Sequence, residues 1–191
     1  MQPRARILIA EDEAIIRLDL REMLEEEGYD VVGEAGDGKT AVRLAEELRP
    51  DLAILDIVMP GMDGLAAAAA INKGEWSAVL ILTAFSQRDF VEKATKTGAM
   101  AYLVKPFDKQ DLMPAVELAM ARWAEVRALA DESKDLSERL ESRKLVERAK
   151  GIIMKEHGLS EQESFRFIQK IAMEQRATMA SVAEKLLAKI E

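Results

Sequence analysis

The chain has 191 residues, of which 49% are hydrophobic and 32% charged, enough for one large or two small globular domains. It has no cysteine, which excludes disulfides, thiolate metal sites and cysteine nucleophiles, and any histidine-based metal cluster or catalytic triad would depend on the single histidine, His157. No run approaches the roughly 18 apolar residues of a membrane span, and the N-terminal residues turn acidic where a signal peptide would stay apolar, so we expect a cytoplasmic protein with no membrane partner.

The net charge of -8 is unevenly distributed along the chain. Residues 1–117 carry 13 basic and 22 acidic side chains, whereas residues 118–191 carry 14 and 13. Within the second part, residues 142–191 hold 10 basic and 7 acidic side chains, so this end can approach a polyanion that the first part would repel. The difference predicts two regions with different electrostatic roles.

Short aliphatic runs alternate with amphipathic stretches over residues 1–117. The runs have the length and β-branched content of buried parallel strands, and they lie at residues 6–10, 31–35, 52–56, 79–83 and 101–104. Helices that stop at a glycine or a proline are predicted at residues 14–27, 38–48, 64–73 and 87–97, and a further helix starts near Asp108. This alternation predicts an α/β fold with a doubly wound, five-stranded parallel sheet, in which ligands bind outside the carboxyl ends of the strands.

Side chains with related chemistry stand at these predicted strand ends. The first strand is followed by Glu11 and Asp12, the third ends in Asp56, the fourth in Thr83, and the fifth leads to Lys105. Singly, each could be a charged turn, a solvated lysine or a strand threonine, but the topology places all five at one edge of the sheet. Three converging carboxylates repel one another, and a hard divalent cation such as Mg²⁺ relieves the repulsion. Asp56 beside a lysine and a hydroxyl is then a candidate acceptor of a phosphoryl group.

This set of residues resembles the receiver domain of two-component response regulators, which has a flavodoxin-like fold, over roughly residues 1–120. The resemblance implies that Asp56 accepts a phosphoryl group from a sensor histidine kinase. It also implies a magnesium site made by Glu11, Asp12, Asp56 and the backbone carbonyl of Val58, a switch made by Thr83 and Tyr102, and an active-site Lys105 before a cis Pro106. Glu11 replaces the more usual aspartate of the family.

Val58 also bears on the alternatives for Asp56. A dehalogenase-like phosphatase would need a second acid two residues after Asp56, where this chain has Val58. Because a valine side chain has no polar atom to position an attacking water, we expect a slowly hydrolysed acyl phosphate. The protein is therefore predicted to be no enzyme beyond slow autodephosphorylation.

A predicted helical linker at residues 121–141 follows the receiver-like region. Val126, Leu129, Leu136 and Leu140 recur at a spacing of three and four, but Ser133 and Arg143 occupy the intervening seam positions. A dimer stem and a stiff connector both fit this broken pattern. A homodimer that forms on phosphorylation is one expectation.

Residues 142–191 are predicted to form three short amphipathic helices. Leu145, Ala149, Ile152 and Ile153 form an apolar stripe that ends at Gly158, Ser160 opens a capping-box sequence with Glu163, and Thr178 can cap a third helix. A bundle of this size has no room for a large catalytic cleft. Binding is therefore the expected role.

The same residues resemble the ANTAR output module, a family of RNA-binding transcription antiterminators, over roughly residues 135–191. The family's Ala-Lys-Gly falls on Ala149, Lys150 and Gly151, and its basic position near the end of the second helix falls on Arg176, whereas Ser164 replaces the usual alanine. The resemblance implies that Lys150 and Arg176 bind an RNA stem-loop, with Arg148, Arg166 and Lys170 as candidates by charge alone. Gly151 costs about 1 kcal/mol relative to alanine inside a helix, so a close partner or tight helix packing should require it.

Two other functions compete with RNA binding. A DNA-binding helix-turn-helix regulator would want a basic recognition helix, but residues 181–190 offer only two lysines and one glutamate. A phosphorylation-controlled protein-interaction module is the third candidate. In each case phosphorylation would act through a population shift in which Asp56 draws in Thr83 and Tyr102 follows.

Overall fold

The computed structural model describes residues 4–84 and 97–188 and divides the chain into two compact units, Met1–Val126 and Arg127–Glu191. The helix predicted at residues 87–97 lies almost wholly outside the described residues. Among those residues, no helix combines the length and the apolar character that crossing a bilayer requires.

The first unit is built on a five-stranded parallel sheet in the order β2-β1-β3-β4-β5. Its strands are β1 (Arg6–Ala10), β2 (Asp30–Ala35), β3 (Leu52–Asp56), β4 (Ala78–Thr83) and β5 (Ala101–Val104). Every residue of β3 and β4 is buried, because helices cover both faces of the sheet. The order is that of the flavodoxin-like fold, so the predicted fold class is confirmed.

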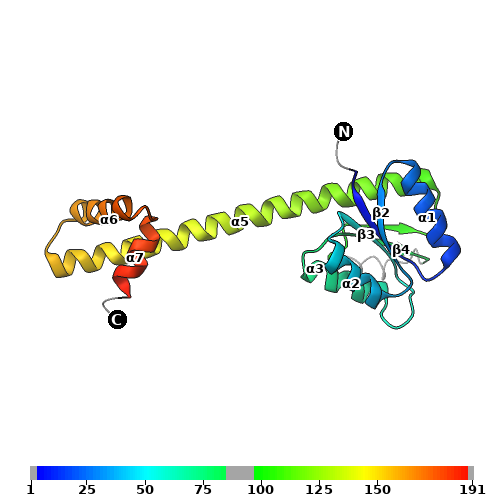
Figure 1. Ribbon diagram of the computed structural model, residues 1–191, viewed down its shortest axis with the longest axis horizontal. Coiled ribbons are helices and arrows are strands. Elements are labelled where there is room, and N and C mark those ends of the chain that lie inside the picture. Colours follow the sequence, from blue (N-terminus) through cyan, green and yellow to red (C-terminus); the bar gives the residue numbers. More distant parts are fainter. Residues whose placement is uncertain (1–3, 85–96, 189–191) are drawn as a thin grey trace. The chain divides into compact units, whose positions relative to one another are not determined.

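Helices cover the two faces of this sheet (Figure 1). They are α1 (Ala14–Glu26), α2 (Gly38–Leu48), α3 (Gly64–Lys73) and the first part of α5 (Lys109–His157). Alanines of α2 and α3 pack on Leu8, Leu55 and Ile81 on one face. Leucines of α1 and α5 pack on Ile9, Ile54 and Leu80 on the other. Alternate strand residues thus fill two separate cores, which hold the strand ends in register.

The second unit packs the C-terminal part of α5 against α6 (Glu161–Gln175) and α7 (Met179–Leu187). Gly158 follows α5 with a φ of 65°, a left-handed conformation that glycine adopts without strain. Ser160 and Glu163 form the predicted capping box, and Thr178 accepts a hydrogen bond from the backbone N–H of Ser181. The first helix of this unit is the end of the 49-residue α5, which runs on from the linker without a break because no residue from 115 to 150 is a proline or a glycine.

Candidate functional site

Three carboxylates meet where β1 and β3 end. Glu11, Asp12 and Asp56 each offer an oxygen, and these atoms lie within 4.8 Å of one another. Glu11 and Asp56 are buried, whereas Asp12 is exposed. Like charges at this separation in a partly dehydrated site repel one another, so the cluster is suited to a hard cation with oxygen ligands.

Lys105 joins two of these carboxylates. Its ammonium lies 2.6 Å from Glu11 Oε2 and 3.1 Å from Asp56 Oδ1. Burial raises the pKa of Glu11, and the charge of Asp56 adds to that rise although the hydrogen bond from Lys105 opposes it. Burial opposes the charge of Lys105, but its hydrogen bonds to Glu11 and Asp56 outweigh this effect and raise its pKa. Lys105 therefore stays an ammonium at neutral pH and offsets part of the negative charge.

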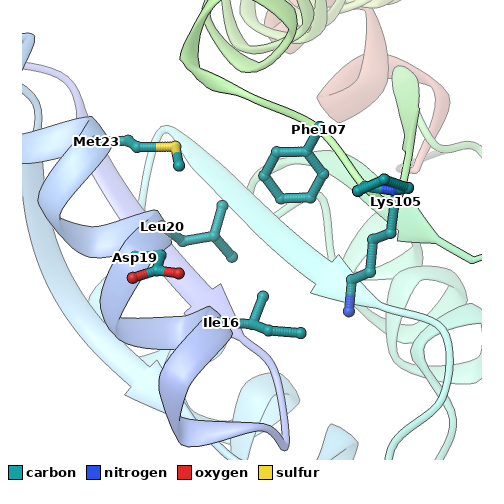
Figure 2. Close-up of a pocket in the computed structure, with 7 residues that line it drawn as sticks. Ile16, Asp19, Leu20, Met23, Lys105 and Phe107 are labelled. Carbon is teal, nitrogen blue, oxygen red and sulfur yellow. The ribbon is translucent and has the colours of Figure 1, made fainter.

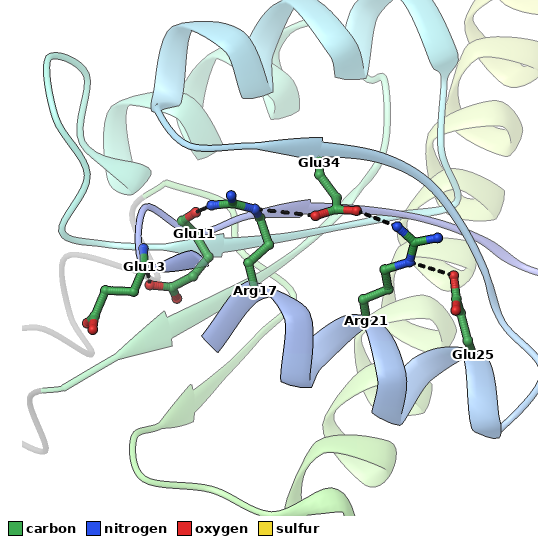
Figure 3. Close-up of polar contacts among 6 residues, drawn as sticks. All are labelled: Glu11, Glu13, Arg17, Arg21, Glu25 and Glu34. Atoms are coloured by element: carbon green, nitrogen blue, oxygen red, sulfur yellow. Dashed lines mark hydrogen bonds and ion pairs between the residues drawn. The ribbon is translucent and has the colours of Figure 1, made fainter. Parts of the chain in front are cut away.

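A chain of ion pairs ties α1 and β2 to the backbone of the acidic pair (Figure 3). The guanidinium of Arg17 donates a hydrogen bond to the backbone carbonyl of Glu11 and lies 3.3 Å from Glu34 Oε2. Glu34 also contacts Arg21, at 2.9 Å, and Arg21 in turn pairs with Glu25. This chain ties the backbone of Glu11, the first residue of the acidic pair, to α1 and β2.

The turn after β3 approaches Asp56 closely. Asp63 caps α3 by accepting a hydrogen bond from the backbone N–H of Ala66, and Gly64 donates its N–H to the carbonyl of Ile57. A Cβ at Gly64 would overlap the carbonyl oxygen of Asp56. Glycine at this position therefore lets the first turn of α3 pack against the backbone of the aspartate.

The remaining receiver residues lie around this edge. Thr83 is buried at the end of β4, and its carbonyl accepts a 2.7 Å hydrogen bond from the backbone N–H of Lys105. The Lys105–Pro106 peptide bond is cis. Tyr102, on β5, is 48% exposed, and Val58, two residues after Asp56, is also exposed. The edge therefore offers a buried hydroxyl and an exposed aromatic ring on adjacent strands.

In the second unit, Lys150 is held by two glutamates. Its side chain is 8% exposed, and its ammonium lies 2.8 Å from Glu161 Oε1 and 2.9 Å from Glu147 Oε2. Hydrogen bonds to these glutamates raise the pKa of Lys150, and the bond to Glu161 has the larger effect. The hydrogen bond between Lys150 and Glu161 also lowers the pKa of Glu161. An RNA phosphate would have to compete with these carboxylates for Lys150.

The other predicted RNA-binding residues do not form one cluster. Arg148 and Arg166 are exposed, and Lys170 lies 3.9 Å from Glu174. Arg176 caps the C-terminus of α6, so the 15 residues of the helix separate it from Glu161 by roughly 22 Å along the axis. Lys150 and Arg166 line the same groove, whereas Arg176 stands at the far end of α6.

Gly151 is exposed on α5, and a Cβ there would meet nothing within 4 Å. Within the described residues, tight packing therefore does not account for this glycine, and approach by a partner is the alternative that the structure leaves open.

The fold and this site define a class of protein: the chain belongs to the response regulators that combine a receiver domain with an ANTAR domain. The model of the response regulator receiver domain matches residues 7–117, and that of the ANTAR domain matches residues 134–187. Over 182 residues the chain is 58% identical to the transcriptional regulatory protein PdtaR of Mycobacterium tuberculosis, covering 95% of this chain and 89% of that protein.

Solved receiver structures match the first unit. The receiver domain of the putative response regulator NarL from Mycobacterium tuberculosis has a TM-score of 0.60 at 33% identity, covering 62% of this chain and 97% of that one. A CheX–CheY–BeF3–Mg complex from Borrelia burgdorferi has a TM-score of 0.56 at 27% identity, covering 59% of this chain and 86% of that one.

Two residues that contribute to these sites escaped the sequence analysis. Arg17 contacts a backbone carbonyl, and no local pattern indicates such a partner. Phe165 follows the apolar spacing of α6, yet it is 41% exposed. Arg17 could have been noticed as a basic residue that follows the acidic pair closely in the sequence. Phe165 could not, because a phenylalanine at helical spacing is usually a core residue.

Proposed function

We propose that this protein accepts a phosphoryl group from a sensor histidine kinase on Asp56, and that the phosphorylated state controls RNA binding and transcription antitermination by residues 142–191. The observation that carries the proposal is the placement of the Lys105 ammonium between Asp56 and the buried Glu11 at the edge of a receiver fold. Asp56 is held by the rigid ends of parallel strands, as an acceptor group should be.

The donor set fits Mg²⁺. Three carboxylates converge there, and Lys105 offsets only part of their negative charge. Glu11, Asp12, Asp56 and the carbonyl of Val58 would hold the ion. The similar CheY from Borrelia burgdorferi was solved in a complex that contains BeF3 and Mg²⁺. When bound, it would neutralise charge on the transferring group.

The transfer needs no further nucleophile. A carboxylate oxygen of Asp56 attacks the phosphorus of a phosphohistidine, a P–O bond forms, and the P–N bond breaks with its electron pair returning to the imidazole, which then takes up a proton from solvent. The ammonium of Lys105, 3.1 Å from Asp56 Oδ1, is placed to contact the phosphoryl oxygens. The side chain of Val58 has no polar atom that could orient an attacking water, so we expect the acyl phosphate to persist.

An apolar groove beside Lys105 suits a kinase helix (Figure 2). It has a volume of about 400 Å³ and is lined by Ile16, Asp19, Leu20 and Met23 of α1 and by Lys105, Pro106 and Phe107. Leu20 and Met23 of α1 face Phe107 across it. An amphipathic helix that fills the groove would place its phosphohistidine near Asp56.

Phosphorylation would shift the population of receiver conformations. The hydroxyl of Thr83 is drawn toward the phosphoryl group, and Tyr102, exposed on the neighbouring strand, moves with it. We propose that this shift acts in the cytoplasm and favours a homodimer that binds an RNA stem-loop through residues 142–191. The excess of 10 basic over 7 acidic side chains there is small, so two copies would strengthen binding.

Intact mass measurement tests the acceptor. Incubation with acetyl phosphate and Mg²⁺ should add one phosphoryl group to the wild type, and none when EDTA removes the metal or when Asp56→Asn replaces the acceptor. A gain of mass by the Asp56→Asn variant would overturn the assignment. Titration of the phosphorylated chain with RNA hairpins, duplex DNA and cell extract then separates RNA binding from the two competing outputs.

A further inference from the structure

Phe165 occupies an unusual place on α6. Its ring is 41% exposed and lines two grooves, one of about 400 Å³ and one of about 540 Å³. It is the only residue common to the two lining sets. A ring that is partly exposed and lines two grooves has an accessible aromatic surface, unlike a phenylalanine packed into a core.

Apart from Phe165, every residue that lines the first groove has a polar or charged end group. Its other lining residues are Lys150, Glu161, Gln162, Arg166 and Gln169. An apolar anchor from a protein partner would meet amide and charged end groups around the ring. A flat ring edged by amides instead matches an unpaired nucleobase, which stacks through its face and forms hydrogen bonds through its edge.

The second groove adds a cation. It is lined by Ser142, Arg143, Val146 and Glu147 of α5 and by Thr178, Met179 and Ala180 beside α7. Among the described residues, no hydrogen bond or ion pair engages the side chains of Arg143, Gln162 or Gln169. These groups are therefore available to a ligand, whereas Lys150 is engaged by two glutamates.

We propose that Phe165 is a stacking platform for an unpaired base of an RNA loop, with Gln162 and Gln169 binding the edge of the base. Arg143 binds a neighbouring phosphate from the second groove. This inference rests on the proposed RNA-binding function and identifies its ligand as a single-stranded loop rather than a duplex. A stacked base contributes about 1–3 kcal/mol, which corresponds to about 5- to 150-fold in affinity.

Binding measurements on the full-length, phosphorylated protein test the platform. The probes are hairpins selected by the wild type from a library with randomised loops, and Phe165→Leu should weaken their binding by at least fivefold, whereas Phe165→Tyr should retain it. Phe167→Leu is the matched control, because Phe167 is 40% exposed on the same helix but lines neither groove. Gln169→Ala, at an exposed position, should change the base preferred at one loop position.

A fluorescent base analogue keeps the test independent of folding in the variants. With 2-aminopurine in the selected loop, the wild type should quench its fluorescence as the base stacks on the ring. If the wild type selects no hairpin, both the RNA-binding function and the platform are wrong. If it binds hairpins but Phe165→Leu and Phe167→Leu bind equally and no loop position is quenched, the platform alone is wrong.

Discussion

At the scale of single residues, Lys105 supplies the positive charge that offsets the repulsion within the acidic cluster when no metal ion is bound. Its ammonium bonds Glu11 and Asp56, so Lys105→Met leaves two neighbouring carboxylates without that partner. We expect a loss of about 2 kcal/mol in the free energy of unfolding, less than for a fully buried pair because Lys105 is partly exposed. Mg²⁺ should restore much of the loss by supplying positive charge.

Urea denaturation with Mg²⁺ and with EDTA measures this effect. Lys109→Met is the control, because Lys109 pairs with Glu26 and Glu27 away from the acidic cluster. Its effect should not depend on the metal. Equal losses for Lys105→Met in the two buffers would show that Lys105 does not balance the cluster.

Two serines of α6 should respond in opposite directions to substitution by alanine. The hydroxyl of Ser164 is fully buried and has no hydrogen-bond partner among the described residues, so Ser164→Ala should stabilise the second unit by about 1 kcal/mol. Ser160 caps the same helix, so Ser160→Ala should destabilise it by about 1 kcal/mol. Hydrogen exchange of α6 peptides in the full-length protein measures both, and slower exchange in Ser160→Ala or faster exchange in Ser164→Ala would contradict this account.

At the scale of elements, the capping box links the stability of α6 to pH. Hydrogen bonds from the hydroxyl and then the backbone N–H of Ser160 lower the pKa of Glu163. As the pH falls below about 4.5, Glu163 therefore becomes protonated in the unfolded chain before it does so in the folded chain. The stabilisation by ionised Glu163 is complete above that pH and is lost as pH falls through the folded-state pKa.

Glu163→Gln should remove this pH-dependent contribution. Urea denaturation from pH 7 to pH 3, followed by helical circular dichroism, should show the variant less stable than the wild type at pH 7, with the difference shrinking toward pH 3. Glu184→Gln, at an exposed position of α7, is the control. A difference that stays constant with pH would exclude the carboxylate as its source.

Helix α1 borders the groove proposed for the kinase. Ile15 is 77% exposed at its start, so Ile15→Arg should leave the fold intact but weaken docking, with about tenfold slower phosphorylation by an autophosphorylated kinase. Phosphorylation by acetyl phosphate should not change. Glu46→Arg introduces the same side chain on α2, at the other face of the sheet, and should affect neither reaction. Equal loss with both donors would place the effect in the chemistry instead of docking.

Sequence patterns predicted the sheet well because its strands are short, β3 and β4 at its centre are wholly buried, and the strands are separated by helices that end near a glycine or a proline. The strand ends, with Asp56 among them, follow from that topology. The partners of individual groups do not follow: Arg17 meets a carbonyl, and Lys150 meets Glu161 across a turn. Such contacts depend on rotamers and packing, which carry no periodic signal.

At the scale of the whole molecule, the exposed apolar side chains of α5 predict self-association. Leu129, Leu136 and Leu140 are each more than half exposed and follow a coiled-coil spacing, but Ser133 interrupts the seam. A second copy paired along this stripe would bury them, although the broken seam makes the pairing weak. We therefore expect a stable dimer only when phosphorylation adds a second contact.

Light scattering on the full-length chain, before and after treatment with acetyl phosphate and Mg²⁺, tests this expectation. The phosphorylated wild type should dimerise, and Leu136→Lys should raise the dissociation constant at least about tenfold, because a lysine would be buried in the seam. Glu138→Lys introduces the same side chain two residues away, on the other side of α5, and should not weaken the dimer. A dimer that tolerates Leu136→Lys must pair through another surface, and a phosphorylated chain that stays monomeric would leave the stripe to a different partner.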